Sequence, residues 1–418
     1  STATGTAQNS GTGLKDAYKD YFSIGVAVNM RNITTPEQIA IIKNDFNSIT
    51  AENDMKPQPT EPAYGQFNWE NADKIADFCR SNGIKLRGHC LIWHSQIGQW
   101  MYQDEKGNPV SKEKLFANMK HHITAIMERY KDVVYAWDVV NEAISDGGWQ
   151  GSRPGMGQQS GPYRNSPLYQ IAGDEFIKKA FIYAREVDPD VLLFYNDYNA
   201  ADPGKRDRIY NMVKAMKEEG VPIDGIGMQG HYNIYGPSME DVDAALTKYS
   251  TIVKHIHITE LDIRANEEMG GQLNFSREAG NISPVVKTLQ EDQYARLFRV
   301  LRKHKDVVDN VTFWNLSDRD SWLGARNYPL PYDENYKPKP VYNIIKDFDP
   351  ALDVAEVKED FRPSTLNQPG QQYPMVNSQG YARFRVVAPD AKSVIVSLGL
   401  GGRGGPVLRK DKEGVGVG

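Results

Sequence analysis

The chain has 418 residues, of which 40% are hydrophobic and 25% are charged, with 49 Lys and Arg against 54 Asp and Glu. These values exclude a disulfide-stapled miniprotein and a chain that is disordered over most of its length. A net charge of -5 gives no basic surface, and no run approaches the roughly 18 apolar residues of a membrane helix. We therefore expect neither nucleic acid nor a membrane as a partner, and a substrate that is not a polyanion.

The chain begins with a Ser-, Thr- and Gly-rich stretch, which predicts a disordered segment over residues 1–13. Eight short apolar runs then alternate with longer helical patterns, as in parallel α/β proteins. The predicted strands are Ser23–Val28, Ser48–Thr50, Ile84–Cys90, Val134–Val139, Val191–Tyr195, Gly225–Met228, His255–Thr259 and Val311–Phe313. Because eight parallel strands can close on themselves, we expect an α/β fold of the (β/α)8 TIM-barrel class over residues 14–350. A doubly wound open sheet is the alternative architecture.

The sequence predicts the ends of two of the helices. Thr35, Pro36 and Gln38 supply an N-cap, a first-turn proline and the Gln of a capping box. Asn71 is expected to open the later helix and Gly83 to close it.

The pattern changes after about residue 350. Residues such as Pro363 and Pro374 stand among polar residues, so residues 351–378 are predicted to form a linker. Beyond it, Tyr381–Val387 and Ser393–Leu398 alternate like two β-strands. Because two strands rarely fold alone, residues 379–418 are predicted to be an incomplete, sandwich-like all-β module.

Polar and aromatic residues gather where the predicted barrel strands end, which is where such barrels place their chemistry. They are Glu52, Asn53, Lys56, His89, Trp93, His94, Gln96, Asn141, Glu142, Asn196, Asp197, Tyr198, Gln229, His231, Glu260, Asp262, Trp314 and Trp322. Any one of them alone would be read as part of a satisfied core network. Their recurrence at seven strand ends instead predicts a binding cleft.

Glu142 and Glu260 directly follow apolar strands, so both are expected to point into the mouth of the barrel. Two opposed carboxyl groups are what cleavage of a glycosidic bond needs, because one protonates the leaving oxygen while the other attacks or stabilises the sugar carbon. The alternative is that both are structural, salt-bridged acids. Asp262 can orient His231, which in turn can hold Glu260 ionised as a nucleophile.

A catalytic metal is the competing explanation for the histidines of the chain. The candidate ligands are His89, His94, His231, His255 and Glu260. However, His255 and His257 stand at the beginning of their strand, away from the mouth, and no HExxH spacing occurs. We expect no metal and no cofactor.

The chain from Leu14 to Phe348 resembles the family 10 glycoside hydrolases, the endo-β-1,4-xylanases with (β/α)8 barrels. The resemblance rests on seven motifs that lie at the strand ends. They are ITAENDMK at Ile49–Lys56, RGHCLIWHSQ at Arg87–Gln96, WDVVNEA at Trp137–Ala143, YNDYN at Tyr195–Asn199, GIGMQGHY at Gly225–Tyr232, ITELDI at Ile258–Ile263 and TFWNLSDRDSW at Thr312–Trp322.

The resemblance implies a role for each site residue. It makes Glu142 the acid/base and Glu260 the nucleophile, with Asn141 on the 2-hydroxyl of the cleaved sugar and Asp138 orienting His89 or its neighbours. The residues that it places around the cleaved sugar are Lys56, His89, Trp93, Gln229, His231 and Trp314. Those that it places on the glycone side are Glu52, Asn53, Gln96 and Trp322, and Tyr198 is a stacking platform on the leaving-group side.

The function that the resemblance implies is a retaining endo-1,4-β-xylanase acting on xylan and xylo-oligosaccharides, with carboxyl groups roughly 5–5.5 Å apart. Gln96 and Trp322 would exclude glucose, because xylose lacks the exocyclic hydroxymethyl group. A non-catalytic polysaccharide-binding barrel and a cellulase or other β-glycanase are the alternatives. We expect a monomeric catalytic domain that meets its polymer outside the cell, as a secreted, cell-surface or periplasmic protein.

The tail from about Gln368 resembles the start of a family 48 type immunoglobulin-like module, as found before esterase domains in two-enzyme xylan-degrading proteins. The chain contains no G-x-S-x-G elbow, so an esterase module is expected only in a longer parent protein. An ordinary linker with a sandwich fragment is the alternative interpretation of this tail.

Overall fold

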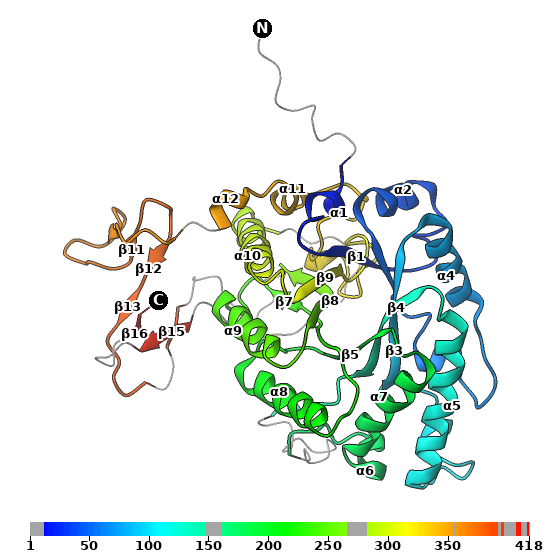
Figure 1. Cartoon of the computed structure of the whole chain (residues 1–418). Helices are drawn as coiled ribbons and strands as arrows, with labels where there is room; N and C mark the ends of the chain where they lie inside the picture. Colours follow the sequence, from blue (N-terminus) through cyan, green and yellow to red (C-terminus); the bar gives the residue numbers. More distant parts are fainter. Residues whose placement is uncertain are drawn as a thin grey trace.

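The computed structural model describes residues 12–147, 161–265, 282–353, 356–391, 394–396, 407–410 and 416–417. The predicted disordered segment 1–13 lies almost entirely outside these residues. Figure 1 shows one large barrel with a smaller β-structured tail beside it.

The strands of the large unit form a closed parallel barrel (Figure 1). They are β1 (Ser23–Val28), β2 (Ser48–Ala51), β3 (Lys85–Trp93), β4 (Val134–Asn141), β5 (Leu192–Asp197), β6 (Gly225–Met228), β8 (His255–Arg264) and β9 (Val308–Phe313), with a short β7 (His231–Asn233). Neighbouring strands pair in parallel, and pairing of β6 with β8 and of β1 with β9 closes the circle. The predicted (β/α)8 barrel is therefore confirmed, and the open sheet is wrong.

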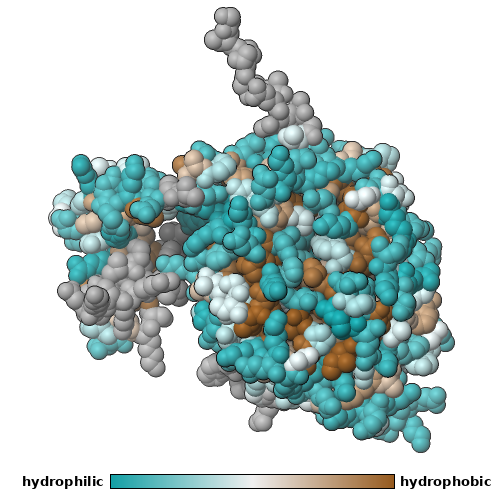
Figure 2. All heavy atoms as spheres, in the orientation of Figure 1, coloured by the Kyte–Doolittle hydropathy of each residue, from teal (hydrophilic) through white to brown (hydrophobic). Residues whose placement is uncertain are grey.

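Helices surround the strands. They are α1 (Leu14–Ala17), α2 (Pro36–Asp45), α3 (Pro57–Thr60), α4 (Glu70–Asn82), α5 (Lys112–Tyr130), α6 (Pro167–Ala172), α7 (Glu175–Val187), α8 (Pro203–Glu218), α9 (Met239–Ser250), α10 (Pro284–Lys303), α11 (Pro340–Lys346) and α12 (Pro350–Asp353). In the same view the surface of the barrel is mostly hydrophilic, and hydrophobic residues gather toward the middle of the face (Figure 2). None of the helices that the structure describes is long and apolar enough to cross a membrane.

The observed ends of α2 and α4 agree only in part with those predicted from the sequence. Thr35 is the N-cap of α2, but its side chain makes no capping bond. The other half of the box is also missing, because the Gln38 amide oxygen accepts from Asn32 Nδ2 at 2.8 Å and the Thr35 N–H donates to the Arg31 carbonyl at 3.0 Å. Gly83 ends α4 in the left-handed conformation, at φ 63°, as expected. The expectation for Asn71 is wrong, because α4 already begins at Glu70.

The tail forms two small antiparallel sheets. The first orders β10 (Arg362–Pro363), β11 (Met375–Val376) and β12 (Ala382–Arg383), and the second orders β13 (Arg385–Val386), β16 (Gly416–Val417), β15 (Val407–Lys410) and β14 (Val394–Ile395). The all-β character predicted for the tail is therefore confirmed. The expected strand Tyr381–Val387 is divided between the two sheets, and β10 and β11 lie within the segment expected to be linker.

Candidate active site

A cavity of about 600 Å³ opens at the carboxyl ends of the barrel strands. Fifteen of the eighteen residues predicted at the strand ends line it, joined by Asn199, Tyr232, Arg264 and Leu323. His94, Asn196 and Asp197 are not part of this lining. Asp138, the remaining predicted site residue, lies below the cavity and is 1% exposed. The closed barrel thus brings together side chains that are far apart in the sequence.

Glu142 follows β4 in a backbone conformation that is rare outside glycine, with φ 58°. Its N–H donates to the Asn196 carbonyl at 2.9 Å, which fixes the turn. The side-chain amides of Asn141 and Gln229 donate to Glu142 Oε2 at 3.1 and 3.0 Å. Burial, followed by the negative charge of Asp197, raises the pKa of Glu142, so this carboxyl tends to keep its proton.

Glu260 lies in the middle of β8 and is 6% exposed. His231 Nε2 donates to its Oε1 at 2.9 Å, and Asn196 Nδ2 donates to its Oε2 at 3.0 Å. Burial opposes ionisation, but the hydrogen bond from His231 and the charges of His89 and His231 outweigh it and lower the pKa of Glu260. The surroundings therefore shift the pKa values of these two carboxyl groups in opposite directions.

His231 connects Glu260 to a second carboxylate. Its Nδ1 donates to Asp262 Oδ1 at 2.9 Å, while Trp322 Nε1 donates to Asp262 Oδ2 at 2.8 Å. Burial favours the neutral imidazole, but Asp262 and Glu260 raise the pKa of His231 to about 10. With both ring nitrogens protonated, His231 donates to the two carboxylates at once.

Asn196 links the two glutamates, a role that the sequence did not predict although it placed Asn196 at a strand end. Its Nδ2 donates both to Glu260 Oε2 and to Asn141 Oδ1, at 3.0 Å each, and Asn141 in turn donates to Glu142. Thr259 fixes the amide orientation by donating to its Oδ1 at 2.6 Å. Its position near the carboxyl end of β5 agrees with the prediction from the sequence.

A buried ionic chain supports His89 from below. His89 Nδ1 donates to Asp138 Oδ2 at 2.8 Å, and Arg87 binds both Asp138 oxygens, at 2.8 and 3.0 Å. Arg87 Nε also donates to His257 Nδ1, whose Nε2 lies 2.6 Å from Asp309 Oδ1. Burial opposes the charge on Asp138, but Arg87 and His89 lower its pKa to about 2. Sequence analysis did not assign a role to Arg87 or Asp309.

The glycone side expected from the sequence contains Glu52, Asn53 and Lys56. Lys56 Nζ donates to Asn53 Oδ1 at 2.7 Å and lies 5.2 Å from the centre of the Trp93 ring. Burial raises the pKa of Glu52 to about 7, although the nearby Asn315 side chain and the charge of Lys56 oppose the shift. This carboxyl therefore titrates near neutrality.

Tyr198 lies on the opposite side and is held by three charged residues. Its hydroxyl donates to Asp146 Oδ2 at 2.5 Å and accepts from Arg164 Nη2 at 2.7 Å. Lys205 Nζ lies 3.5 Å from the ring centre and pairs with Asp146 and Asp197 at 2.8 and 2.9 Å. These contacts fix the ring as a flat platform, which suits stacking on a sugar.

The remaining aromatic residues form walls of the cavity. Trp314 is 5% exposed and meets His89 edge-on, with ring centres 5.4 Å apart. Trp322 is 43% exposed and meets His231 edge-on at 5.0 Å. Gln96 also lines the cavity, from a left-handed backbone position at φ 47°.

Within the described residues, no group of three or more His, Cys, Asp or Glu side chains is arranged to hold a metal ion. His255 and His257 both bind Asp309, at 2.5 and 2.6 Å, rather than reaching the cavity. The chemistry that the geometry offers is thus acid/base and nucleophilic. A carboxyl that keeps its proton and a carboxylate held ionised share one cleft with rigid aromatic walls.

Comparisons with known proteins agree on one family. The family model "Glycosyl hydrolase family 10" matches residues 13–348. An "Endo-1,4-beta-xylanase/feruloyl esterase" of Xylanibacter ruminicola is 63% identical over 414 residues, which are 98% of this chain and 56% of that protein. The "Endo-1,4-beta-xylanase" of Geobacillus stearothermophilus is 39% identical over 336 residues, which are 79% of this chain and 96% of that protein.

A solved structure gives the same result. "A psychrophilic glycoside hydrolase family 10 endo-beta-1,4-xylanase" is 68% identical with a TM-score of 0.75, covering 81% of this chain and 100% of its own. This chain spans 56% of the Xylanibacter ruminicola relative, so about half of that protein's length is matched here.

Proposed function

The chain belongs to glycosyl hydrolase family 10, and we propose that it is a retaining endo-1,4-β-xylanase that cleaves internal β-1,4-xylosidic bonds of xylan. The observation that carries the proposal is the opposite tuning of two carboxyl groups in one cleft. Burial and the charge of Asp197 raise the pKa of Glu142, and the hydrogen bond from His231 helps to lower the pKa of Glu260. Such a pair divides the roles of acid and nucleophile.

The reaction proceeds in two displacements. Glu260 attacks the anomeric carbon, the bond from that carbon to the leaving oxygen breaks, and Glu142 gives this oxygen its proton. Glu142, now ionised, then takes a proton from water, and the water oxygen displaces Glu260 from the sugar. Two inversions retain the configuration. His231 and Asn196 hold the Glu260 carboxylate in place throughout, because both donate to it.

The other cleft residues bind and orient the sugar rings. We assign contacts around the cleaved sugar to Lys56, His89, Trp93, Asn141, Gln229, His231 and Trp314. Glu52, Asn53, Gln96 and Trp322 are assigned to the glycone side, and Tyr198 to the leaving-group side. The positioning residues are Asp138, which holds His89, and Asp262, which holds His231.

Isosteric substitutions test the two roles. Glu260→Gln and Glu142→Gln are each expected to lower kcat on xylan by at least a thousandfold, with unchanged circular dichroism. Glu128→Gln, at an exposed position of α5, is the matched control and keeps full activity. NMR of the first product anomer must show the β configuration. Near-full activity of either cleft variant, or an α product, would contradict the mechanism.

Substrate class is tested by initial rates on xylan and on carboxymethylcellulose. A xylanase hydrolyses xylan far faster, because the hydroxymethyl group of glucose adds bulk that Gln96 and Trp322 must exclude. Comparable rates would favour a broader β-glycanase, and no hydrolysis of either polymer would favour a binding protein.

The wider organisation is part of the same proposal. We assign residues 14–350 to a monomeric catalytic domain, 351–378 to a linker and 379–418 to part of a β-module, in a protein that acts outside the cell. The Xylanibacter ruminicola relative is named both a xylanase and a feruloyl esterase, and its match extends over the tail of this chain. This match supports an esterase module in a longer parent protein.

A further inference from the structure

Arg164 contacts two parts of the active site at once, although the mechanism described above gives it no role. Its side chain is mostly buried, with 21% of its surface exposed. Its Nε donates to the backbone carbonyl of Glu142 at 2.8 Å, and its Nη2 donates to the Tyr198 hydroxyl at 2.7 Å. One guanidinium group thus binds both the residue that gives the proton and the platform on the leaving-group side.

The backbone of Glu142 depends on its neighbours. Its φ of 58° lies in the left-handed region, which costs a residue other than glycine free energy and persists only where the surroundings fix it. The Glu142 N–H donates to the Asn196 carbonyl, and the next two N–H groups donate to the Tyr195 hydroxyl at 2.9 and 3.0 Å. The Glu142 carbonyl accepts from Arg164 Nε. Arg164 therefore completes the set of contacts that fixes the turn of the acid/base residue.

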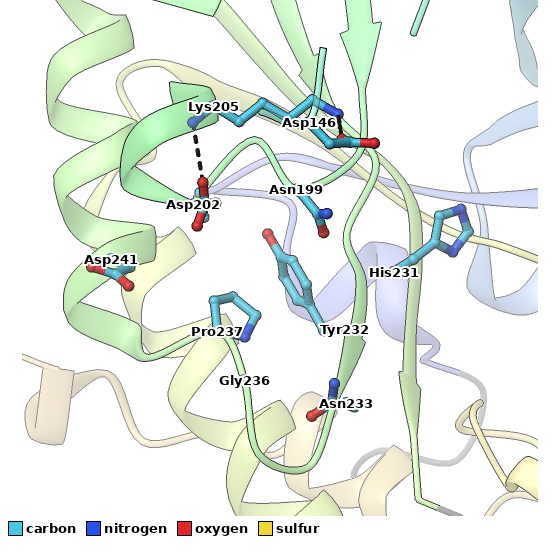
Figure 3. Close-up of a pocket in the computed structure, with 11 residues that line it drawn as sticks. Asp146, Asn199, Asp202, Lys205, His231, Tyr232, Asn233, Gly236, Pro237 and Asp241 are labelled. Atoms are coloured by element: carbon cyan, nitrogen blue, oxygen red, sulfur yellow. Dashed lines mark hydrogen bonds and ion pairs between the residues drawn. The ribbon is translucent and has the colours of Figure 1, made fainter. Parts of the chain in front are cut away.

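The Tyr198 end of this link is held by ion pairs. The Tyr198 hydroxyl donates to one oxygen of Asp146, and the other oxygen binds Lys205 at 2.8 Å, a contact that Figure 3 shows. Lys205 lies on α8, is 1% exposed and also pairs with Asp197 at 2.9 Å. A shift of the Tyr198 ring would disturb these pairs, so Arg164 connects Glu142 to a fixed point.

The planar guanidinium group sets the distance between its two partners, because Nε and Nη2 belong to one rigid fork. The sugar that stacks on Tyr198 carries the leaving oxygen, to which Glu142 must bring its proton. From these contacts we propose that Arg164 is a positioning residue, which holds Glu142 at the place relative to Tyr198 that protonation of the leaving oxygen requires. The proposal rests on the proposed xylanase function. Misplacing a catalytic group by about 1 Å costs roughly a hundredfold in rate.

Aryl β-xylobiosides test this role, because their leaving groups differ in their need for a proton. Phenol leaves poorly and needs a proton from Glu142, whereas dinitrophenolate leaves without one. Since kcat/KM reports the step in which this bond breaks, Arg164→Met should lower it about 30-fold on phenyl β-xylobioside but less than about threefold on the dinitrophenyl substrate. Arg164→Lys keeps the charge but lacks the fork, so its effect on the phenyl substrate should be intermediate.

Arg208→Met is the matched control. Arg208 on α8 donates to a carbonyl of the same loop, that of Ser145, at 2.9 and 3.1 Å, rather than to Glu142 or Tyr198. Its loss should lower kcat/KM on the two aryl substrates by the same factor. Tyr198→Phe removes the other end of the link, so its effect and that of Arg164→Met on the phenyl substrate should combine to less than their product.

The outcomes separate this inference from the proposed function. Equal losses on the two aryl substrates overturn it, whether in Arg164→Met or, where that variant does not fold, in Arg164→Lys with unchanged circular dichroism. Effects of Arg164→Met and Tyr198→Phe that multiply in the double variant also overturn it, because the two residues then act separately. An unaltered chain that hydrolyses neither xylohexaose nor the aryl xylobiosides would instead refute the xylanase assignment itself.

Discussion

The different ionisation of two glutamates depends on single neighbouring residues. Asp197 faces Glu142 with a negative charge, whereas His231 gives Glu260 a hydrogen bond and a positive charge. On this basis kcat/KM should fall at low pH as Glu260 gains a proton, and at high pH as Glu142 loses its own. The active pH range is thus set by residues that do not themselves react.

Asp197→Asn tests this dependence. The substitution removes a negative charge that raises the pKa of Glu142, so that pKa should fall and the alkaline limb of the pH profile should move to lower pH. The acid limb, set by Glu260, should move much less. The profile of kcat/KM on xylohexaose measures both limbs, and the exposed Asp190→Asn serves as control. An alkaline limb that does not move would show that Asp197 does not raise the pKa of Glu142.

A second prediction for a single residue concerns the contribution of Arg87 to stability. It is fully buried and binds both oxygens of Asp138, which holds His89. Arg87→Met leaves a buried carboxylate without its cation, so the free energy of unfolding should fall by about 3–5 kcal/mol. Urea unfolding measures this change. Arg80→Met, which breaks exposed ion pairs with Asp77 and Asp132, should cost at most about 1 kcal/mol. Similar losses in both variants would contradict the buried chain.

Some of these residues could be predicted from the sequence and others could not. Glu142 and Glu260 directly follow apolar runs, so the local pattern was enough to place them at the mouth. Asn196 and Arg87 act through partners 64 and 51 residues away, Glu260 and Asp138 respectively. Such pairings are decided by the closure of the barrel, and no local pattern records them.

At the scale of the elements, the pairing of β3 with β4 places the Trp137 ring where a side chain on Gly88 would lie. A Cβ on Gly88 would lie 2.2 Å from the ring of Trp137, which is 1% exposed. These residues are register partners in the parallel pair. The adjoining partners, His89 and Asp138, support the catalytic cleft, so the spacing of these strands matters for the site.

Gly88→Ala should therefore lower the free energy of unfolding by about 1–3 kcal/mol, because the added Cβ would overlap the almost fully buried ring of Trp137. Thermal or urea unfolding measures the loss. Gly204→Ala is the control, since an added Cβ in the first turn of α8 would make only ordinary contacts at 3.4 Å or more. That variant should be neutral or slightly stabilising. A neutral Gly88→Ala would show that the strands can separate without cost.

Helix ends were less predictable than strands. The Thr35 and Gln38 spacing matches a capping box, but Asn32 competes for the Gln38 side chain and the box does not form. Gly83 was predictable because its left-handed conformation is a backbone requirement that few other residues meet. A prediction based on a backbone requirement, as at Gly83, was thus more reliable than one based on a polar side chain that can bond to another partner.

At the scale of the whole molecule, the alternation of eight apolar runs with helices was enough to predict a closed barrel. The structure of the tail was harder to predict from the sequence, because its strands have only two to four residues and form two separate sheets. Contact between the two parts includes Arg299 on α10, which donates to the Tyr381 hydroxyl at 2.7 Å. The family 10 xylanase structure that is 68% identical aligns over its whole length, and the alignment covers 81% of this chain.

An ion pair joins the end of α12 to α10. Arg302, 7% exposed on α10, binds both oxygens of Asp353 at 2.7 and 2.9 Å. A chain that ends at residue 360 keeps this pair, so its unfolding free energy and its kcat/KM on xylohexaose should match those of the full chain. A chain that ends at residue 349 leaves Arg302 without its carboxylate and should be less stable by about 3 kcal/mol. Equal stability of the two truncated chains would place the end of the barrel before Asp353, and loss of activity in the longer one would make the tail part of the catalytic unit.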